Sequence, residues 1–194
     1  MNYKLLTEEK VKRVRQAFEV AFIETPEEFM ASTLKWRGKL YSENPNAPIV
    51  PIPKYDEVIY WAKIKNYKEA TFAEALSFLS NISNPVYFMS DLPLNGYVNM
   101  HFLNDPKATI GFIAVHNDAK EFAQFIYDEW KLYNTFDCEQ EGTWFEPLLP
   151  DDLYVFDDSF SWLLVFTHHN ADDFDPDRPR SQNSYNRACF VVRA

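Results

Sequence analysis

The stretch from Leu153 to His168, which reads LYVFDDSFSWLLVFTH, decides what kind of fold this chain adopts. Its two ends, 153–156 and 162–167, are runs of aromatic, aliphatic and β-branched residues, which favour strands. The segment between them, DDSFS, supplies Asp and Ser residues that are typical of turns. The stretch therefore predicts two antiparallel strands joined by a tight turn, that is, a β-hairpin with strands at 153–157 and 162–167.

Further strands are expected on both sides of this hairpin, at 86–91, 97–103, 109–116 and 188–193. The strands follow a run of helices, and one more helix is inserted among them. This order favours an α+β fold with a mainly antiparallel sheet over a parallel α/β fold. No internal repeat or long linker divides the sequence. We therefore expect residues 1–194 to form a single α+β domain.

Helix starts are marked by residues that cap the first turn. Thr7 precedes an apolar stripe that ends at Phe22, and the pairs Thr25/Glu28 and Thr71/Glu74 form capping boxes. Asp118 and Glu121 open another helix, whose apolar residues recur with the helical period. The expected helices are 8–22, 26 to about 37, 56–65, 72–79 and 118–134. We expect the N-terminal helices and the 118–134 helix to cover one face of the sheet.

The composition limits the classes of function. The 194 residues carry a net charge of −10 with a pI of about 4.8, which argues against general affinity for nucleic acid or anionic membrane. Two cysteines do not make a disulfide framework, and the N-terminus has no apolar stretch of signal-peptide length. We expect a cytoplasmic protein that does not insert into membranes.

The negative charge is concentrated towards the C-terminus. Residues 128–194 hold 14 acidic and 5 basic side chains, against 15 and 14 in residues 1–127. Ten of the carboxylates lie in 128–158, where Lys131 is the one basic residue, and we expect them to be exposed. This segment also holds an aromatic pair. The candidate partner-binding residues are Asp128, Glu129, Asp137, Glu139, Glu141, Trp144, Phe145, Glu146, Asp151, Asp152, Asp157 and Asp158.

Motifs for catalysis and cofactor binding are missing from the sequence. Four glycines provide no phosphate-binding loop, and neither a serine-nucleophile elbow nor a Cys-x-x-Cys pair is present. Cys138 lies between Asp137 and Glu139, whose negative charge disfavours a reactive thiolate. The His- and Asp-rich segment 168–177 lacks the Gly and Glu of a calcium loop. We therefore expect no catalytic residue, no cofactor and no metal.

The 153–168 hairpin also resembles one found in several small, mostly uncharacterised bacterial families. The shared pattern is Tyr, two hydrophobic residues and Asp, then Trp, an apolar run and Thr-His, matched here by Tyr154, Asp157, Trp162 and Thr167. Some of these families are similar to immunity proteins, which neutralise a toxin made by the same or a neighbouring cell. The likeness covers about 16 of 194 residues. It implies a hairpin and not a set of active-site residues.

Two functions remain open at this stage. The first is a non-catalytic acidic binding protein, an immunity-type inhibitor of a basic protein partner such as a nuclease toxin domain. The second is an enzyme or small-ligand-binding domain whose pocket is assembled from His101, His116, His168 and nearby carboxylates. A convex acidic surface favours binding, whereas a concave pocket with a buried His–carboxylate pair favours chemistry. The sequence does not indicate an oligomeric state.

Overall fold

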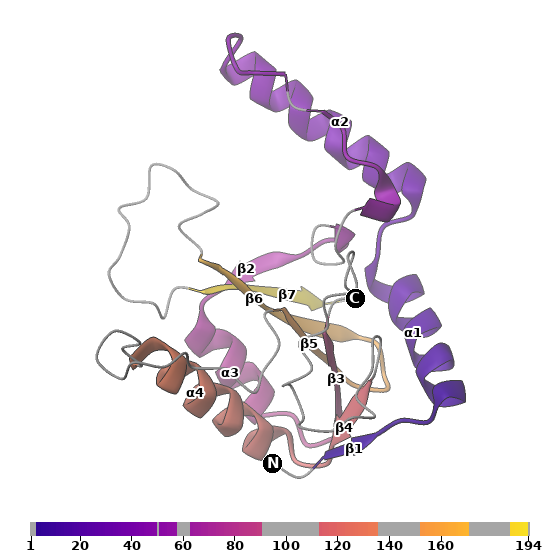
Figure 1. The fold of residues 1–194 in the computed structure, drawn as a ribbon, viewed down its shortest axis with the longest axis vertical. Coiled ribbons are helices and arrows are strands. Elements are labelled where there is room, and N and C mark those ends of the chain that lie inside the picture. The colour runs from indigo at the N-terminus through magenta and orange to yellow at the C-terminus, as the bar shows by residue number, and fades with distance from the viewer. Residues whose placement is uncertain are drawn as a thin grey trace, which may run out of the picture.

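The computed structural model describes residues 3–49, 51–57, 63–90, 113–135, 152–170 and 187–193 (Figure 1). These residues form one seven-stranded sheet in the order β1-β4-β3-β5-β6-β7-β2, and every neighbouring pair is antiparallel. The predicted α+β class with a mainly antiparallel sheet is confirmed. The strands are β1 (Tyr3–Leu5), β2 (Lys68–Ala70), β3 (Val86–Ser90), β4 (Ala114–His116), β5 (Leu153–Phe156), β6 (Trp162–Asn170) and β7 (Arg187–Arg193).

The predicted hairpin of β5 and β6 lies inside the sheet. Its register pairs Leu153 with Phe166 and Phe156 with Leu163. Side chains from both strands are buried on both faces: Val155 and Leu164 belong to one core cluster, and Tyr154 and Val165 belong to the other. A strand that is covered on two sides has a continuous apolar sequence, because neither face meets water.

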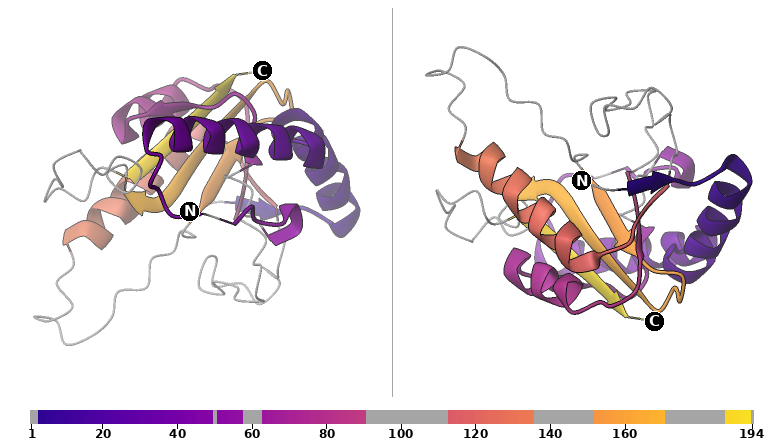
Figure 2. Two further views of the ribbon diagram at one scale, coloured as in Figure 1. Left: turned by 90° about the horizontal axis from the view of Figure 1, so that it is seen from above. Right: turned by 90° about the horizontal axis from the view of Figure 1, so that it is seen from below.

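Helices cover both faces of this sheet (Figure 2), so the prediction that all of them cover one face is wrong. Helix α1 (Glu8–Phe22) packs Phe18 and Phe22 on one face. Helices α3 (Phe72–Ser80) and α4 (Ala119–Thr135) pack on the other face, through residues such as Leu79 and Phe122. The reason is the apolar character of the central strands, which need cover on both sides.

The predicted caps begin the helices at the expected residues. The Thr7 hydroxyl accepts from the backbone of Lys10, and complete capping boxes are present at Thr25/Glu28 and Thr71/Glu74. The Asp118 carboxylate accepts the Glu121 N–H at 2.9 Å and caps α4. These side chains supply partners for N–H groups that the first helical turn leaves unpaired.

Several expected elements differ from the structure. Helix α2 (Pro26–Glu43) continues beyond the expected end at 37, and it projects away from the sheet (Figure 1). Of the helix expected at 56–65, residues 58–62 lie outside the described residues. Residues 55–57 form the short 3₁₀ helix η1 (Tyr55–Glu57), and Ile64 forms a β-bridge with Ile23, so the expected helix does not reach residue 65. The expected strand 97–103 and the first part of 109–116 lie outside the described residues. The three-residue strands β1 and β2 were not predicted.

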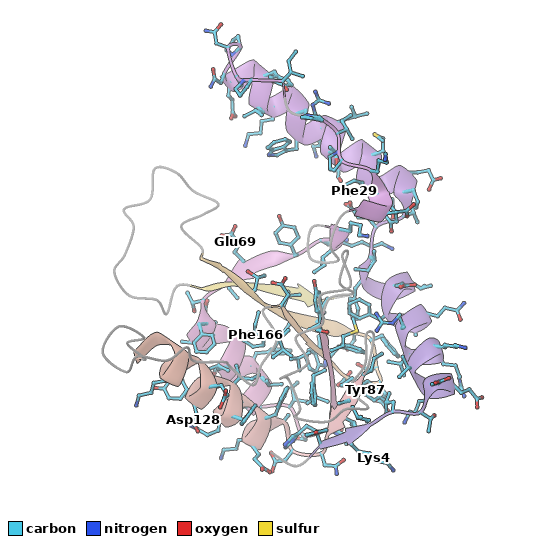
Figure 3. All side chains as sticks on the ribbon, in the orientation of Figure 1. Lys4, Phe29, Glu69, Tyr87, Asp128 and Phe166 are labelled. Atoms are coloured by element: carbon cyan, nitrogen blue, oxygen red, sulfur yellow. The ribbon has the colours of Figure 1, made fainter. Side chains whose placement is uncertain are left out.

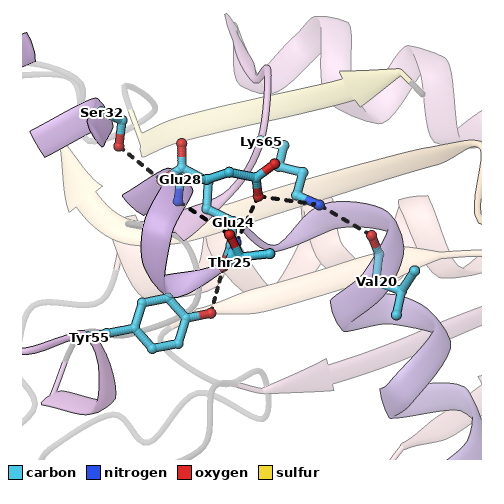
Figure 4. A network of polar contacts seen from close by, with 7 residues as sticks. All are labelled: Val20, Glu24, Thr25, Glu28, Ser32, Tyr55 and Lys65. Carbon is cyan, nitrogen blue, oxygen red and sulfur yellow. Dashed lines mark hydrogen bonds and ion pairs between the residues drawn. The ribbon is translucent and has the colours of Figure 1, made fainter. Parts of the chain in front are cut away.

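Polar contacts hold the turn between α1 and α2 against the segments that precede β2 (Figure 4). The Tyr55 hydroxyl donates to the carbonyl of Glu24 at 2.6 Å. The Lys65 ammonium donates to the carbonyl of Val20 at 3.3 Å and lies 3.8 Å from the Glu28 carboxylate. The base of α2 is thereby attached to the body of the protein.

Candidate functional site

Five of the twelve predicted partner-binding residues lie in the described part of the chain: Asp128, Glu129, Asp152, Asp157 and Asp158. Asp128 is exposed on α4 (Figure 3), and Glu129 next to it is half-buried. Asp158 is exposed in the turn of the β5–β6 hairpin. The remaining seven, Asp137, Glu139, Glu141, Trp144, Phe145, Glu146 and Asp151, lie outside the described residues.

The expected exposure is wrong for Asp152 and Asp157. Their exposed fractions are 9% and 3%. The Asp157 carboxylate accepts hydrogen bonds from the backbone N–H and the hydroxyl of Ser159, so it closes the hairpin turn. A charge held in this way stabilises the turn and is not presented to a partner.

The exposed carboxylates also do not share one surface. Asp128 belongs to α4, which covers the sheet face opposite α1. Asp158 lines a groove with Thr7, Lys10 and Tyr87, on the side of α1. The structure therefore separates these two ends of the predicted acidic segment.

A groove of about 690 Å³ lies between α3 and α4. Helix α4 contributes Glu121, Gln124 and Tyr127 to its wall, and α3 contributes Ser77 and Ser80. Glu121, Gln124 and Asp128 follow one another at the three- and four-residue spacing that places them on one side of the helix. Gln124 donates to the Asp128 carboxylate at 2.9 Å, which fixes that carboxylate beside the groove.

The charge around this groove is mixed but mainly acidic. Asp118 and Glu121 line it together with Lys120, and all three residues are exposed. The Tyr127 ring adds an apolar surface with 38% exposure. Asp128 was among the predicted partner-binding residues, whereas Glu121, Gln124 and Tyr127, which line the groove, were not. Their spacing along the 118–134 helix was the available signal, since residues three and four apart share a helix side.

A second pair of grooves lies beside α1 and differs in charge. Their volumes are about 420 and 380 Å³, and they share Thr7, Lys10 and Tyr87. The Lys10 ammonium lies 5.8 Å from the centre of the Tyr87 ring. Lys4 and Arg13 add further positive charge, while Glu9 and Asp158 oppose it. This balance does not select a ligand of either sign.

The histidines do not assemble into a described catalytic pocket. His116 is 1% exposed, and its ring stacks on Phe122 at 5.4 Å. Its Nδ1 accepts from the backbone N–H of Asp118 at 3.1 Å, so the ring proton lies on Nε2, which is buried and has no hydrogen-bond partner among the described residues. His101 lies outside the described residues, and His168 is in β6 with its side chain outside the described part.

Within the ranges that the structure describes, no group of three or more His, Cys, Asp or Glu is placed to hold a metal ion. No helix among the described residues is both long enough and apolar enough to cross a membrane.

Comparison with known proteins provides no relative: no family model, no curated protein and no solved structure matches this chain.

Proposed function

We propose that this protein is a non-catalytic binding protein that neutralises a basic toxin, such as a nuclease, in the manner of an immunity protein. The observation that carries the proposal is the acidic edge of the α3–α4 groove, where Glu121 and Asp128 are exposed beside a cavity of about 690 Å³. Nucleases that grip phosphates present Lys and Arg side chains. Such a side chain would enter the groove and meet these carboxylates.

The charge of the whole chain supports the same proposal. The net charge is −10, and residues 128–194 hold most of the surplus carboxylates. Complementary charge raises the rate at which two proteins associate and disfavours partners of the wrong sign. The competing proposal of an enzyme has less support. Among the described residues, the buried His116 ring accepts a hydrogen bond from the backbone N–H of Asp118 and is not part of a His–carboxylate pair.

The experiment measures binding kinetics against the basic toxin domain encoded beside the gene. The double variant Glu121→Lys with Asp128→Lys should slow association about tenfold or more at low salt, because it reverses the local field. Raising the salt concentration should reduce this difference, since exposed charges are screened over about 8 Å at physiological ionic strength.

The matched control is Glu43→Lys with Glu69→Lys, which changes the net charge by the same amount at exposed positions on α2 and β2. The control should slow association much less than the groove variant. Equal effects of the two variants would mean that only net charge matters and that the groove does not bind the partner.

A further inference from the structure

The feature that the proposed function leaves unused is the arm formed by α2 and the segment after it, residues 26–49. Beyond its base the arm stands clear of the sheet and of the other helices (Figure 1). Phe29 is the buried residue of α2, and its ring packs on Tyr55 at 5.7 Å. The remaining length of an 18-residue helix, about 27 Å in all, extends into solvent.

The arm exposes large apolar side chains. Met30 is 43% exposed, Leu34 is 53% exposed and Trp36 is 54% exposed, and Ile49 in the following segment is 85% exposed. These are four of the seven large hydrophobic residues that are exposed in the described part of the chain. Apolar side chains gathered on one projecting element are typical of an interaction surface.

One side of α2 is open along its whole length. Glu27, Ala31, Leu34, Lys35 and Gly38 follow one another at helical spacing, and all five are exposed. A Cβ placed on Gly38 would meet no atom within 4 Å. The neighbouring side is partly occupied: Arg37 lies over the Tyr41 ring, and the Tyr41 hydroxyl reaches the carbonyl of Pro48. We call the five residues the open face of α2.

The charges on α2 are arranged so that two copies of the helix can pair with each other. The arm carries three acidic residues, Glu27, Glu28 and Glu43, and three basic residues, Lys35, Arg37 and Lys39. It therefore has no net charge with which to attract the basic partner proposed above. On the open face, Glu27 lies four residues before Ala31 and Lys35 lies four residues after it. Two copies of α2 that cross in antiparallel fashion at Ala31 would place each Glu27 beside the Lys35 of the other copy.

We propose that the occupant of the open face is a second copy of this chain, which packs its α2 antiparallel to the first across a twofold axis. A twofold axis repeats each contact, so both Glu27–Lys35 pairs form together. A parallel arrangement would instead place like charges together. Antiparallel helices also oppose their dipoles favourably. Leu34 supplies the apolar contact of the interface, and the small side chain of Ala31 at the crossing point allows close approach of the two helices.

The expected dimer is weak. Two helices of this length bury less surface than the roughly 1,200 Å² of a stable standard interface. Sedimentation velocity from about 1 to 300 μM should therefore show a reversible monomer–dimer equilibrium with a dissociation constant in the micromolar range. A chain that remains monomeric over this whole range would overturn the proposal.

Charge exchange tests the arrangement. Glu27→Lys and Lys35→Glu should each weaken the dimer about tenfold, because each turns two attractive pairs into repulsive ones. The variant with both substitutions should return to within about threefold of the original dissociation constant. Within one helix these residues lie eight positions apart and do not pair. Restoration therefore has to come from the second copy.

The control is Lys12→Glu, which makes the same charge change at an exposed position on α1. It should leave dimerisation nearly unchanged, and circular dichroism should show that every variant keeps its helix content. The antiparallel pairing would be refuted if neither single substitution changed the dissociation constant of the dimer. It would also be refuted if the variant with both substitutions did not restore that constant. These dimerisation measurements do not involve a toxin, so their outcome does not test the proposed function, which is tested separately by the binding kinetics.

Discussion

The carboxylate of Asp157 accepts a hydrogen bond from the backbone N–H of Ser159, with 3.0 Å between donor and acceptor. The Ser159 hydroxyl donates to the same oxygen. Phe160, three residues after Asp157, has a positive φ of 49°, which is uncommon for a non-glycine residue. The buried carboxylate therefore stabilises the turn between the central strands β5 and β6. In this turn Phe160 has an energetically unfavourable backbone conformation.

This relationship predicts different roles for two adjacent acids. Asp157→Ala should lower the free energy of unfolding by about 1–3 kcal/mol, because it removes the buried carboxylate that accepts two hydrogen bonds from Ser159 in the turn. Asp158→Ala should change it by no more than about 0.5 kcal/mol, since Asp158 is exposed. Urea unfolding at neutral pH measures both. Similar losses in the two variants would contradict the assigned role of Asp157.

The capping box of α3 predicts a pH-dependent contribution to stability. Hydrogen bonds from the Thr71 backbone and hydroxyl lower the pKa of Glu74 below its ordinary value of 4.5. The ionised carboxylate therefore stabilises the folded state above pH 4.5, and this stabilisation is lost as the pH falls through the lowered pKa. Glu74→Gln should reduce stability most near neutral pH and least at acid pH.

The measurement is the free energy of unfolding of both proteins across this pH range. Glu69→Gln is the control, because Glu69 is an exposed residue of β2 that caps no helix. A difference between wild type and Glu74→Gln that stays constant from neutral to acid pH would show that the Glu74 charge does not contribute.

The aromatic core under α1 predicts a large loss of stability. Phe18 is fully buried, and its ring centre lies 5.0 Å from that of Phe156 and 5.4 Å from that of Phe22. Phe18→Ala should lower the free energy of unfolding by about 3–5 kcal/mol, because it leaves a cavity between the helix and the sheet. Val20→Ala, at a residue that is 74% exposed on the same helix, should change it by less than about 0.5 kcal/mol.

The α3–α4 groove predicts an aromatic contact with the toxin. Tyr127→Ala should speed dissociation of the complex, and a true hot spot costs about 2 kcal/mol or more of binding free energy. Stability should hardly change, because the ring is 38% exposed. Tyr67→Ala is the matched control, since Tyr67 is 50% exposed outside the groove. Equal dissociation rates for wild type and Tyr127→Ala would place the binding surface elsewhere.

Local sequence was sufficient for the helix starts and for the hairpin. Thr25 and Thr71 cap their helices through side chains only three residues away, so the signal is contained in a few neighbouring positions. The hairpin at 153–168 combines strand-forming runs with turn residues in one short stretch, and its strands were predicted to within a few residues. These features depend on contacts that the chain makes with its own near neighbours.

Long-range pairing decided what the sequence left open. Residues 3–5 and 68–70 are strands because they pair with β4 and β7, which lie more than a hundred residues away in sequence. Three residues are too few to show the alternation of apolar and polar side chains that predicts a strand. The burial of Asp157 and the groove beside Glu121 likewise follow from how helices and strands pack together.

The sequence by itself determined the α+β class, the capped starts of the helices, the β5–β6 hairpin and the surplus of negative charge, because each depends on composition or on residues close together in the chain. Only the tertiary structure decided that helices cover both faces of the sheet, which carboxylates reach the surface, and that α2 presents an open face. Exposure and proximity arise from contacts between distant segments, and no local pattern encodes them.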